Sequence, residues 1–166
     1  NPAHNTTLGY DADIIAIPNA GNLLLHNSRS SASIRLSATV GDFFVQVITT
    51  SISIYNPTFA FNKSATDLNG GTLAPGDIMR YQINYRNVGN DFSTNTVILD
   101  NIPAGTSYVP GSLRILGVAK TDAAGDDQAE YDAVNNRVVF RVGTGSNAVT
   151  GGNISTGGAG NVVFDV

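Results

Sequence analysis

The sequence contains no cysteine and no tryptophan, and it carries little charge. Only 13% of its 166 residues are charged, about half the usual share of ~25%. Because cysteine is missing, the chain can form no disulfide and offers no thiolate ligand for zinc and no thiol nucleophile. Its nine lysine and arginine residues are scattered and its net charge is −4, so it offers no basic stripe for nucleic acid.

Long apolar runs are also missing, as are the residues that helices favour on their water-facing sides. No stretch reaches the ~18 apolar residues that a membrane-spanning helix needs. Lysine occurs only at positions 63 and 120 and glutamate only at 130, which argues against an all-helical protein. Hydrophobic residues still make up 42% of the chain, which disfavours disorder. The chain opens on Asn1-Pro2-Ala3 without a signal peptide, so we expect a processed product or a piece of a longer protein.

The pattern that is present is an alternation of polar and apolar residues with a period of two, broken by glycine, proline and asparagine. This pattern is typical of β-strands with one wet face, and no segment shows the period of a helix. Strands are predicted over residues 12–17, 33–40, 43–55, 59–63, 77–87, 96–100, 107–109, 112–116, 136–142 and 161–166. Their recurrence about every ten residues predicts an all-β sandwich of antiparallel sheets.

Two parts are expected within this all-β chain. Residues 1–56 form an N-terminal β segment, a strand plus a long hairpin, that packs on or extends the sandwich formed by residues 57–166. Apolar side chains alternate up to the last residue of the sequence, at Val162, Phe164 and Val166. We expect these three residues to form a strand edge that pairs with a neighbouring copy, because an exposed edge readily accepts another strand.

Residues 57–166 resemble the repeat domain of bacterial and archaeal surface proteins known as domain of unknown function eleven. The resemblance rests on four stretches and a closing turn, taken in order along the chain. These are Lys63 with 67–77 (DLNGGTLAPGD), the tyrosine strand ending in 87–90 (NVGN), 100–113 (DNIPAGTSYVPGSL), 120–131 (KTDAAGDDQAEY) and the turn 141–145 (RVGTG). The resemblance implies an immunoglobulin-like fold, export to the cell surface, and a structural or adhesive role.

The same resemblance suggests a covalent cross-link. Immunoglobulin-like surface domains sometimes join a first-strand lysine to a last-strand asparagine or aspartate by an isopeptide bond, with help from a buried acid. Lys63 is the candidate lysine, and the alternative is that its stem lies on the apolar face while its ammonium stays in water. The candidate partners and assisting acids are Asn161, Asp165, Asp77 and Asp100.

The densest acidic cluster is a candidate calcium site. Five carboxylates fall within eleven residues, at Asp122, Asp126, Asp127, Glu130 and Asp132. Calcium takes six to eight oxygen ligands, which a loop of carboxylates at the edge of a sandwich can supply. Because the spacing differs from that of an EF-hand, a solvated acidic loop that binds no metal is the competing interpretation. No other cofactor is indicated.

Modification and catalysis are the remaining site classes. Asn5, Asn62 and Asn153 each begin an Asn-x-Ser/Thr sequence and are candidate glycosylation sites. No nucleophile elbow, metalloprotease, P-loop or dinucleotide-binding motif is present, so we do not expect an enzyme. We expect an extracellular structural module of a cell-surface fibre or large adhesin, with copies of itself or adjacent domains of a longer protein as partners. The alternative is a calcium-dependent module that binds glycans or another surface ligand.

Overall fold

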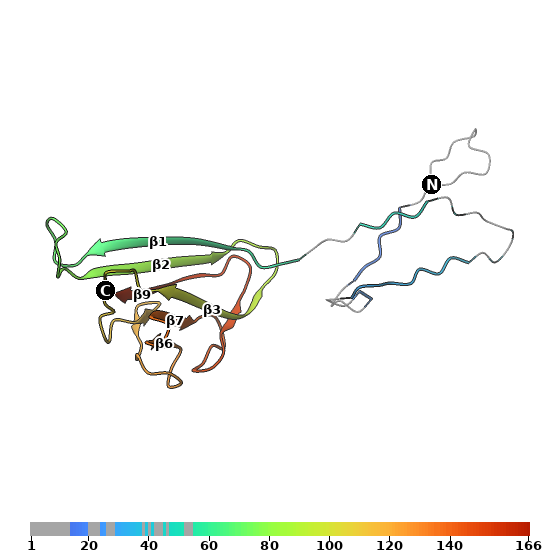
Figure 1. Cartoon of the computed structure of the whole chain (residues 1–166). Helices are drawn as coiled ribbons and strands as arrows, with labels where there is room; N and C mark the ends of the chain where they lie inside the picture. The colour runs from blue at the N-terminus through green and yellow to red at the C-terminus, as the bar shows by residue number, and fades with distance from the viewer. Residues whose placement is uncertain are drawn as a thin grey trace. The chain divides into compact units, whose positions relative to one another are not determined.

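The computed structural model describes residues 14–19, 24–25, 29–37, 39, 41, 45, 47–51 and 55–166. The chain divides into two units, Asn1–Thr50 and Ser51–Val166. All nine strands of the described residues lie in the second unit, which we call the two-sheet unit (Figure 1). No helix long and apolar enough to cross a bilayer occurs in the part of the chain that the structure describes.

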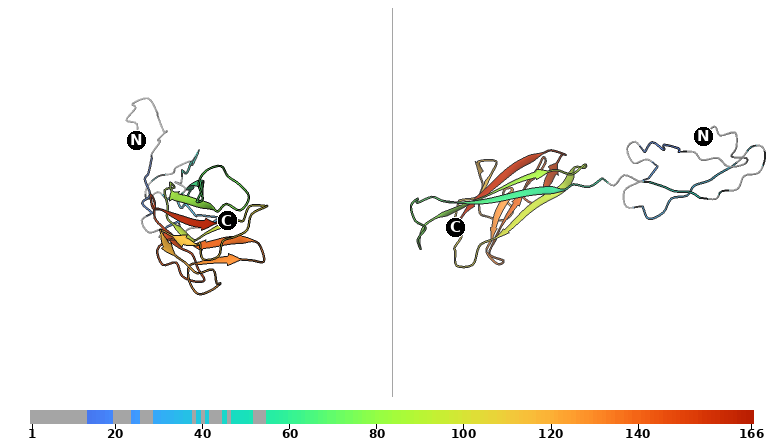
Figure 2. Two further views of the ribbon diagram at one scale, coloured as in Figure 1. Left: turned by 90° about the vertical axis from the view of Figure 1, so that its left-hand side faces the viewer. Right: turned by 90° about the horizontal axis from the view of Figure 1, so that it is seen from above.

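The two-sheet unit consists of two antiparallel sheets. The strands are β1 (Phe59–Asp67), β2 (Met79–Asn87), β3 (Ser93–Asn101), β4 (Arg114–Ile115), β5 (Val118–Ala119), β6 (Ala129–Asp132), β7 (Arg137–Arg141), β8 (Gly152–Ile154) and β9 (Ala159–Asp165). Five strands form one sheet in the order β1-β2-β9-β4-β5, and four form the other in the order β6-β7-β3-β8. The views in Figures 1 and 2 show β1 beside β2 in one layer. The prediction of an all-β protein with antiparallel sheets is confirmed.

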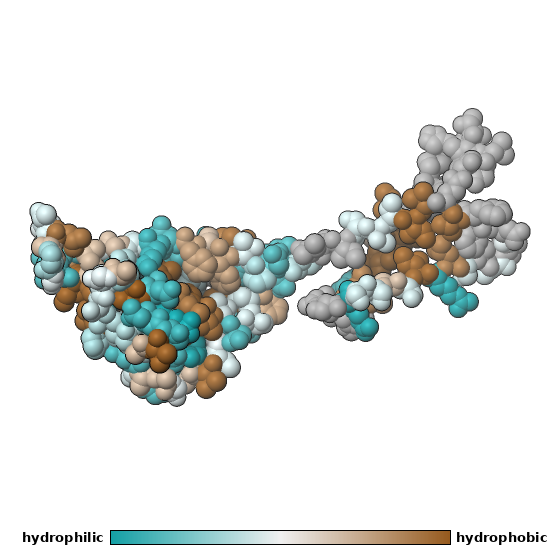
Figure 3. Space-filling model, viewed as in Figure 1, coloured by the Kyte–Doolittle hydropathy of each residue, from teal (hydrophilic) through white to brown (hydrophobic). Residues whose placement is uncertain are grey.

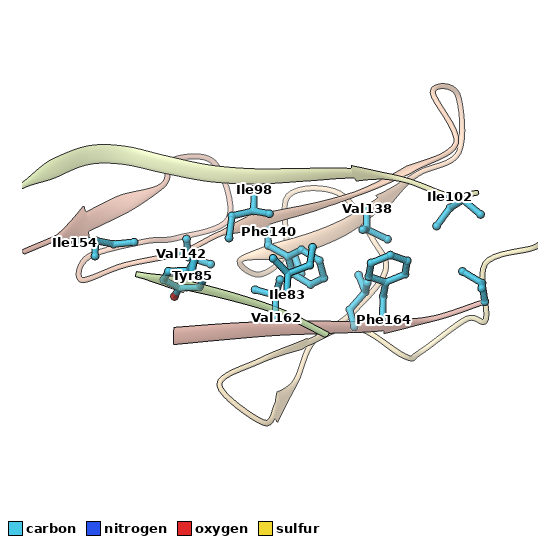
Figure 4. Close-up of a cluster of buried hydrophobic side chains, with 13 residues drawn as sticks. Ile83, Tyr85, Ile98, Ile102, Val138, Phe140, Val142, Ile154, Val162 and Phe164 are labelled. Carbon is cyan, nitrogen blue, oxygen red and sulfur yellow. The ribbon is translucent and has the colours of Figure 1, made fainter. Parts of the chain in front are cut away.

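A single apolar core lies between the two sheets. The five-stranded sheet contributes Ile83 and Tyr85 from β2 and Val162 and Phe164 from β9, and Phe140 faces them from β7 (Figure 4). Alternation explains the arrangement, because every second side chain of a strand points to the same face of its sheet. Burial of these side chains is the main favourable contribution to folding.

Strand β9 is an interior strand, which corrects the predicted strand-exchange edge. It pairs with β2 on one side and with β4 on the other. Val162 and Phe164 are completely buried and Val166 nearly so, with the backbone of Val166 bonded to Met79 in both directions. The apolar run Val162-Val163-Phe164 is typical of a strand covered on both faces. The place where a sequence stops does not determine where a strand lies in its sheet.

Most strands of the two-sheet unit were predictable and three were not. The predicted strands at 59–63, 77–87, 96–100, 112–116, 136–142 and 161–166 overlap β1, β2, β3, β4, β7 and β9. The segment 107–109 is not a strand, and only the N–H of Val109 bonds to β9, at the carbonyl of Asp165. The unpredicted strands β5, β6 and β8 have two to four residues each, too few for an alternating pattern.

The first unit shows no strand among its described residues. No strand is present in the described residues of the predicted strands at 12–17, 33–40 and 43–55, and the rest of these three segments lies outside the described residues. One predicted turn is present, where the side chain of Asn19 accepts hydrogen bonds from the N–H groups of Leu24 and Leu25. Most of the large apolar side chains described in this unit are exposed, among them Ile14, Ile34 and Val47, whereas Leu25 is half-buried. Figure 3 shows hydrophobic residues, in brown, at the surface of this unit.

Candidate functional site

The outer edge of β1 carries a row of backbone groups that no described strand satisfies. β1 lies at the end of its sheet and pairs only with β2. The carbonyl of Thr58 accepts a hydrogen bond of 2.7 Å from the N–H of Val88. Because bonds alternate along an antiparallel pair, the even-numbered residues of β1 bond to β2 and the odd-numbered ones point their N–H and C=O groups outward. The outward residues are Phe59, Phe61, Lys63, Ala65 and Asp67.

The side chains of these same odd-numbered residues face the inside of the unit. Phe61 lies opposite Tyr85 and Lys63 opposite Ile83, and both partners are buried. The rings of Phe59 and Phe61 stack with centroids 5.8 Å apart, yet Phe61 is 59% exposed. Phe61 is therefore an inward-facing aromatic residue whose outer side the described residues leave open.

Strand β3 forms the opposite wall of this opening. β8 pairs with β3 only at Ser93 and Thr96, with an irregularity between them, so no described strand covers the same edge of β3 farther along. Leu99 in this free stretch is 54% exposed. Between β1 and β3 lies a hollow of about 260 Å³, lined by Phe59, Phe61 and Tyr85 on one side and by Thr96, Val97 and Ile98 on the other. We call this opening, with the free edge of β1, the β1–β3 seam.

An ion pair between the two sheets spans the seam beyond this hollow. Lys63 Nζ lies 2.6 Å from Asp100 Oδ2, and it also lies 4.5 Å from the ring centre of Tyr81 and 5.5 Å from that of Phe164. Asp100 Oδ2 is buried, and the ammonium of Lys63 is the partner that the described residues provide for its charge. The pair joins β1 of one sheet to β3 of the other.

The structure brings together only part of the predicted isopeptide set. Lys63 contacts Asp100 as an ion pair. Asp165 instead accepts two hydrogen bonds of 2.9 Å from Arg80, and this hydrogen bonding raises the pKa of the Arg80 guanidinium. Asp77 accepts from the N–H of Ala74 in the turn ahead of β2. Asn161 lies opposite Asn84 in the β2–β9 pair.

The five acidic residues of the predicted calcium site do not converge. Asp122 accepts from the hydroxyl of Tyr108, Asp126 and Asp127 accept from Thr121, Glu130 lies 3.1 Å from Arg141, and Asp132 lies 2.9 Å from Arg137. Glu130 and Asp132 belong to strand β6 rather than to a loop, and each reaches an arginine of the adjacent strand β7. Within the described part of the chain, no group of three or more histidine, aspartate or glutamate side chains is arranged to hold a metal ion.

Two titrations in this region depart from ordinary values. Burial raises the pKa of Tyr108, and the hydrogen bond to Asp122 raises it further. The ring of Tyr108 stacks on that of Tyr131 with centroids 4.3 Å apart, and both rings pack against the apolar core. Hydrogen bonds from Asn135 lower the pKa of Asp132. The folded chain therefore favours the neutral phenol of Tyr108 and the ionised carboxylate of Asp132.

The candidate glycosylation residues are placed as follows. Asn62 is exposed, and its even number in β1 places its side chain on the outer face of the sheet. Asn153 is exposed on β8, where its backbone pairs with Thr144. Asn5 lies outside the described residues.

Sequence reasoning missed the residues that define the seam. Phe61 and Val97 were assigned to strands, but which strand would be an edge depends on pairings between distant segments. The alternation Phe59, Phe61, Lys63 was the available signal, since a lysine at an inward position is typical of an edge strand.

Comparisons with known proteins were made at three levels. Protein-family models, curated proteins and solved structures each yielded no match to this chain. The resemblance to the surface-protein repeat domain stays a prediction.

Proposed function

We propose that this chain is an extracellular structural module of a cell-surface fibre or large adhesin, with an immunoglobulin-like sandwich that associates through β-strand pairing. The observation that carries the proposal is the free edge of β1. It has nine residues, a length of about 30 Å at ~3.3 Å per residue. A long open edge is an aggregation hazard unless a partner strand covers it.

The distribution of charge supports a structural role. The acidic residues between 122 and 132 accept hydrogen bonds from neighbouring hydroxyl and backbone groups or form ion pairs with arginines. Asp165 likewise forms an ion pair with Arg80. Groups held in this way stabilise loops and strands. The resemblance of residues 57–166 to surface-protein repeats points to the same role.

Location at the cell surface tests this proposal. An antibody raised against residues 57–166 should label intact cells of the source organism, and brief protease treatment of those cells should remove the signal. A cytoplasmic protein measured in the same cells should resist the protease and serves as the control. Labelling that appears only after the cells are permeabilised would overturn the proposal.

A further inference from the structure

We infer that the β1–β3 seam binds a strand from the N-terminal segment of a second copy of this chain, centred on residues 47–51. This inference rests on the proposed function, because it names the partner of the same edge. It is carried by three features that we take in turn: the geometry of the seam, the chemistry of the segment, and the path of the chain into β1.

The seam offers a strand both hydrogen bonds and an apolar floor. Phe59, Phe61, Lys63 and Ala65 direct their backbone groups outward, so a strand laid along β1 would satisfy all of them. Every second side chain of that strand would then point over the hollow between β1 and β3. The exposed ring of Phe61 would be covered on its open side.

The N-terminal segment has the properties that this site requires. Val47 is 78% exposed and Ile48 is 52% exposed, so the segment is a strand-like sequence whose apolar side chains are not buried. No charged residue occurs between Asp42 and Lys63. The charge of Lys63 in the seam is already matched by Asp100. An uncharged strand therefore fits the site without leaving a buried charge unpaired, which would be costly.

The path of the chain into β1 favours a second copy over the same chain. Residues 55–58 contain no turn. The N–H of Asn56 bonds to Asn90 Oδ1 at 2.9 Å, and Thr58 bonds to Asn87 and Val88. Gly89 packs so closely on residues 56–58 that an added Cβ would lie 2.4 Å from the carbonyl oxygen of Asn56. These contacts hold residues 56–58 extended along 87–90, so the chain cannot form the tight hairpin at residue 56 that would place Val47 opposite Ala65 of its own β1.

Sedimentation velocity on the full chain tests the association with matched variants. Phe61→Asp places a carboxylate in the seam and should weaken self-association by at least about tenfold. Asn62→Asp adds the same charge to the neighbouring residue on the opposite face and should change it little. The double variant Val47→Asp/Ile48→Asp should weaken it as strongly as Phe61→Asp, and Ser30→Asp/Ser31→Asp is its charge-matched control. Circular dichroism and thermal unfolding establish that every variant folds.

Disulfide trapping identifies the partner strand, because the natural chain has no cysteine. A mixture of Ala65→Cys chains with Val47→Cys chains should form a mixed disulfide dimer under mild oxidation. Val134→Cys, in the exposed turn between β6 and β7, replaces Ala65→Cys as the control and should give little of it. A chain that carries both Ala65→Cys and Val47→Cys should form dimers and higher species.

Each negative result overturns a defined statement. A chain that stays monomeric at all concentrations, or associates equally well with Phe61→Asp, overturns the inference even if the protein labels at the cell surface. A disulfide within one double-cysteine chain shows that the segment binds its own β1 and overturns the assignment to a second copy. Absence of surface labelling overturns the proposed function whatever the association state.

Discussion

The two units of this chain use similar sequence patterns and reach opposite results. Ile34, in an alternating run of the first unit, is 55% exposed, whereas Ile83, in an alternating run of the two-sheet unit, is 6% exposed. Alternation determines which side chains share a face of an extended chain. It does not supply the second layer that must cover that face. Burial therefore depends on partners elsewhere in the sequence.

The two-sheet unit has such partners because distant segments meet. β2 pairs with β9 although more than seventy residues of the sequence separate them, and β3 pairs with β7. The buried side chain of Asn87 adds polar links, donating to the carbonyls of Asp91 and Ile154. Long-range pairing of this kind is what the described residues of the first unit lack.

The strongest test of this difference compares one apolar truncation in each unit. Phe140 is fully buried between the sheets, so Phe140→Ala should lower the free energy of unfolding by about 3–5 kcal/mol. Ile34→Ala should change it by less than about 0.5 kcal/mol, because the side chain is exposed. Urea unfolding followed by circular dichroism at low protein concentration measures both. A comparable loss in the two variants would show that the first unit has a core of its own.

The second test concerns the polar links. Asn87→Ala removes two donated hydrogen bonds and the acceptor for the N–H groups of Thr58 and Gly89, at 3.2 and 3.0 Å. Unsatisfied buried groups are costly, so we expect a loss of about 2–3 kcal/mol in the free energy of unfolding. Asn62→Ala, at an exposed position of β1, is the control and should have almost no effect. Equal unfolding midpoints for the two variants would mean that water replaces the contacts of Asn87.

The class of fold could be predicted from the sequence, but the position of each strand in its sheet could not. The runs that became β2 and β3 are long and alternate clearly, so their local pattern was sufficient. The edge was assigned to β9 instead of β1 because edge and centre differ in pairing, which is a property of the whole fold. The buried run 162–164 was the one local hint.

The candidate site was predictable only in part, for the same reason. Lys63 and Asp100 were both selected from the sequence, and they meet across the seam. Phe61 and Val97 were not selected, since an apolar residue in a strand gives no sign of whether its neighbour strand is missing. The acidic run from Asp122 to Asp132 was interpreted as one cluster because proximity in sequence was the only measure available. Glu130 and Asp132 lie on strand β6 and reach arginines of β7, whereas Asp126 and Asp127 accept hydrogen bonds from Thr121.

The third and smallest predicted effect sharpens the comparison through pH. Burial and the hydrogen bond to Asp122 raise the pKa of Tyr108, whereas an unfolded tyrosine titrates near pH ~10. The unfolded chain therefore loses this proton first. The contribution of the protonated Tyr108 to the free energy of unfolding is complete below about pH 10. It is lost as the pH rises toward the higher pKa of the folded state. We expect the free energy of unfolding to fall above about pH 10, less steeply in Tyr108→Phe than in the natural chain.

The control for this effect is Tyr55, which lies ahead of β1 and is exposed. Tyr55→Phe should leave the alkaline slope unchanged, because the side chain of Tyr55 is exposed. Some slope should persist in Tyr108→Phe, since burial also raises the pKa of Tyr85. Urea unfolding at a series of pH values from about 9 to 11 gives the three slopes. If the alkaline slopes of Tyr108→Phe and Tyr55→Phe are equal, the pKa of Tyr108 in the folded chain is not raised as its burial and its hydrogen bond to Asp122 require.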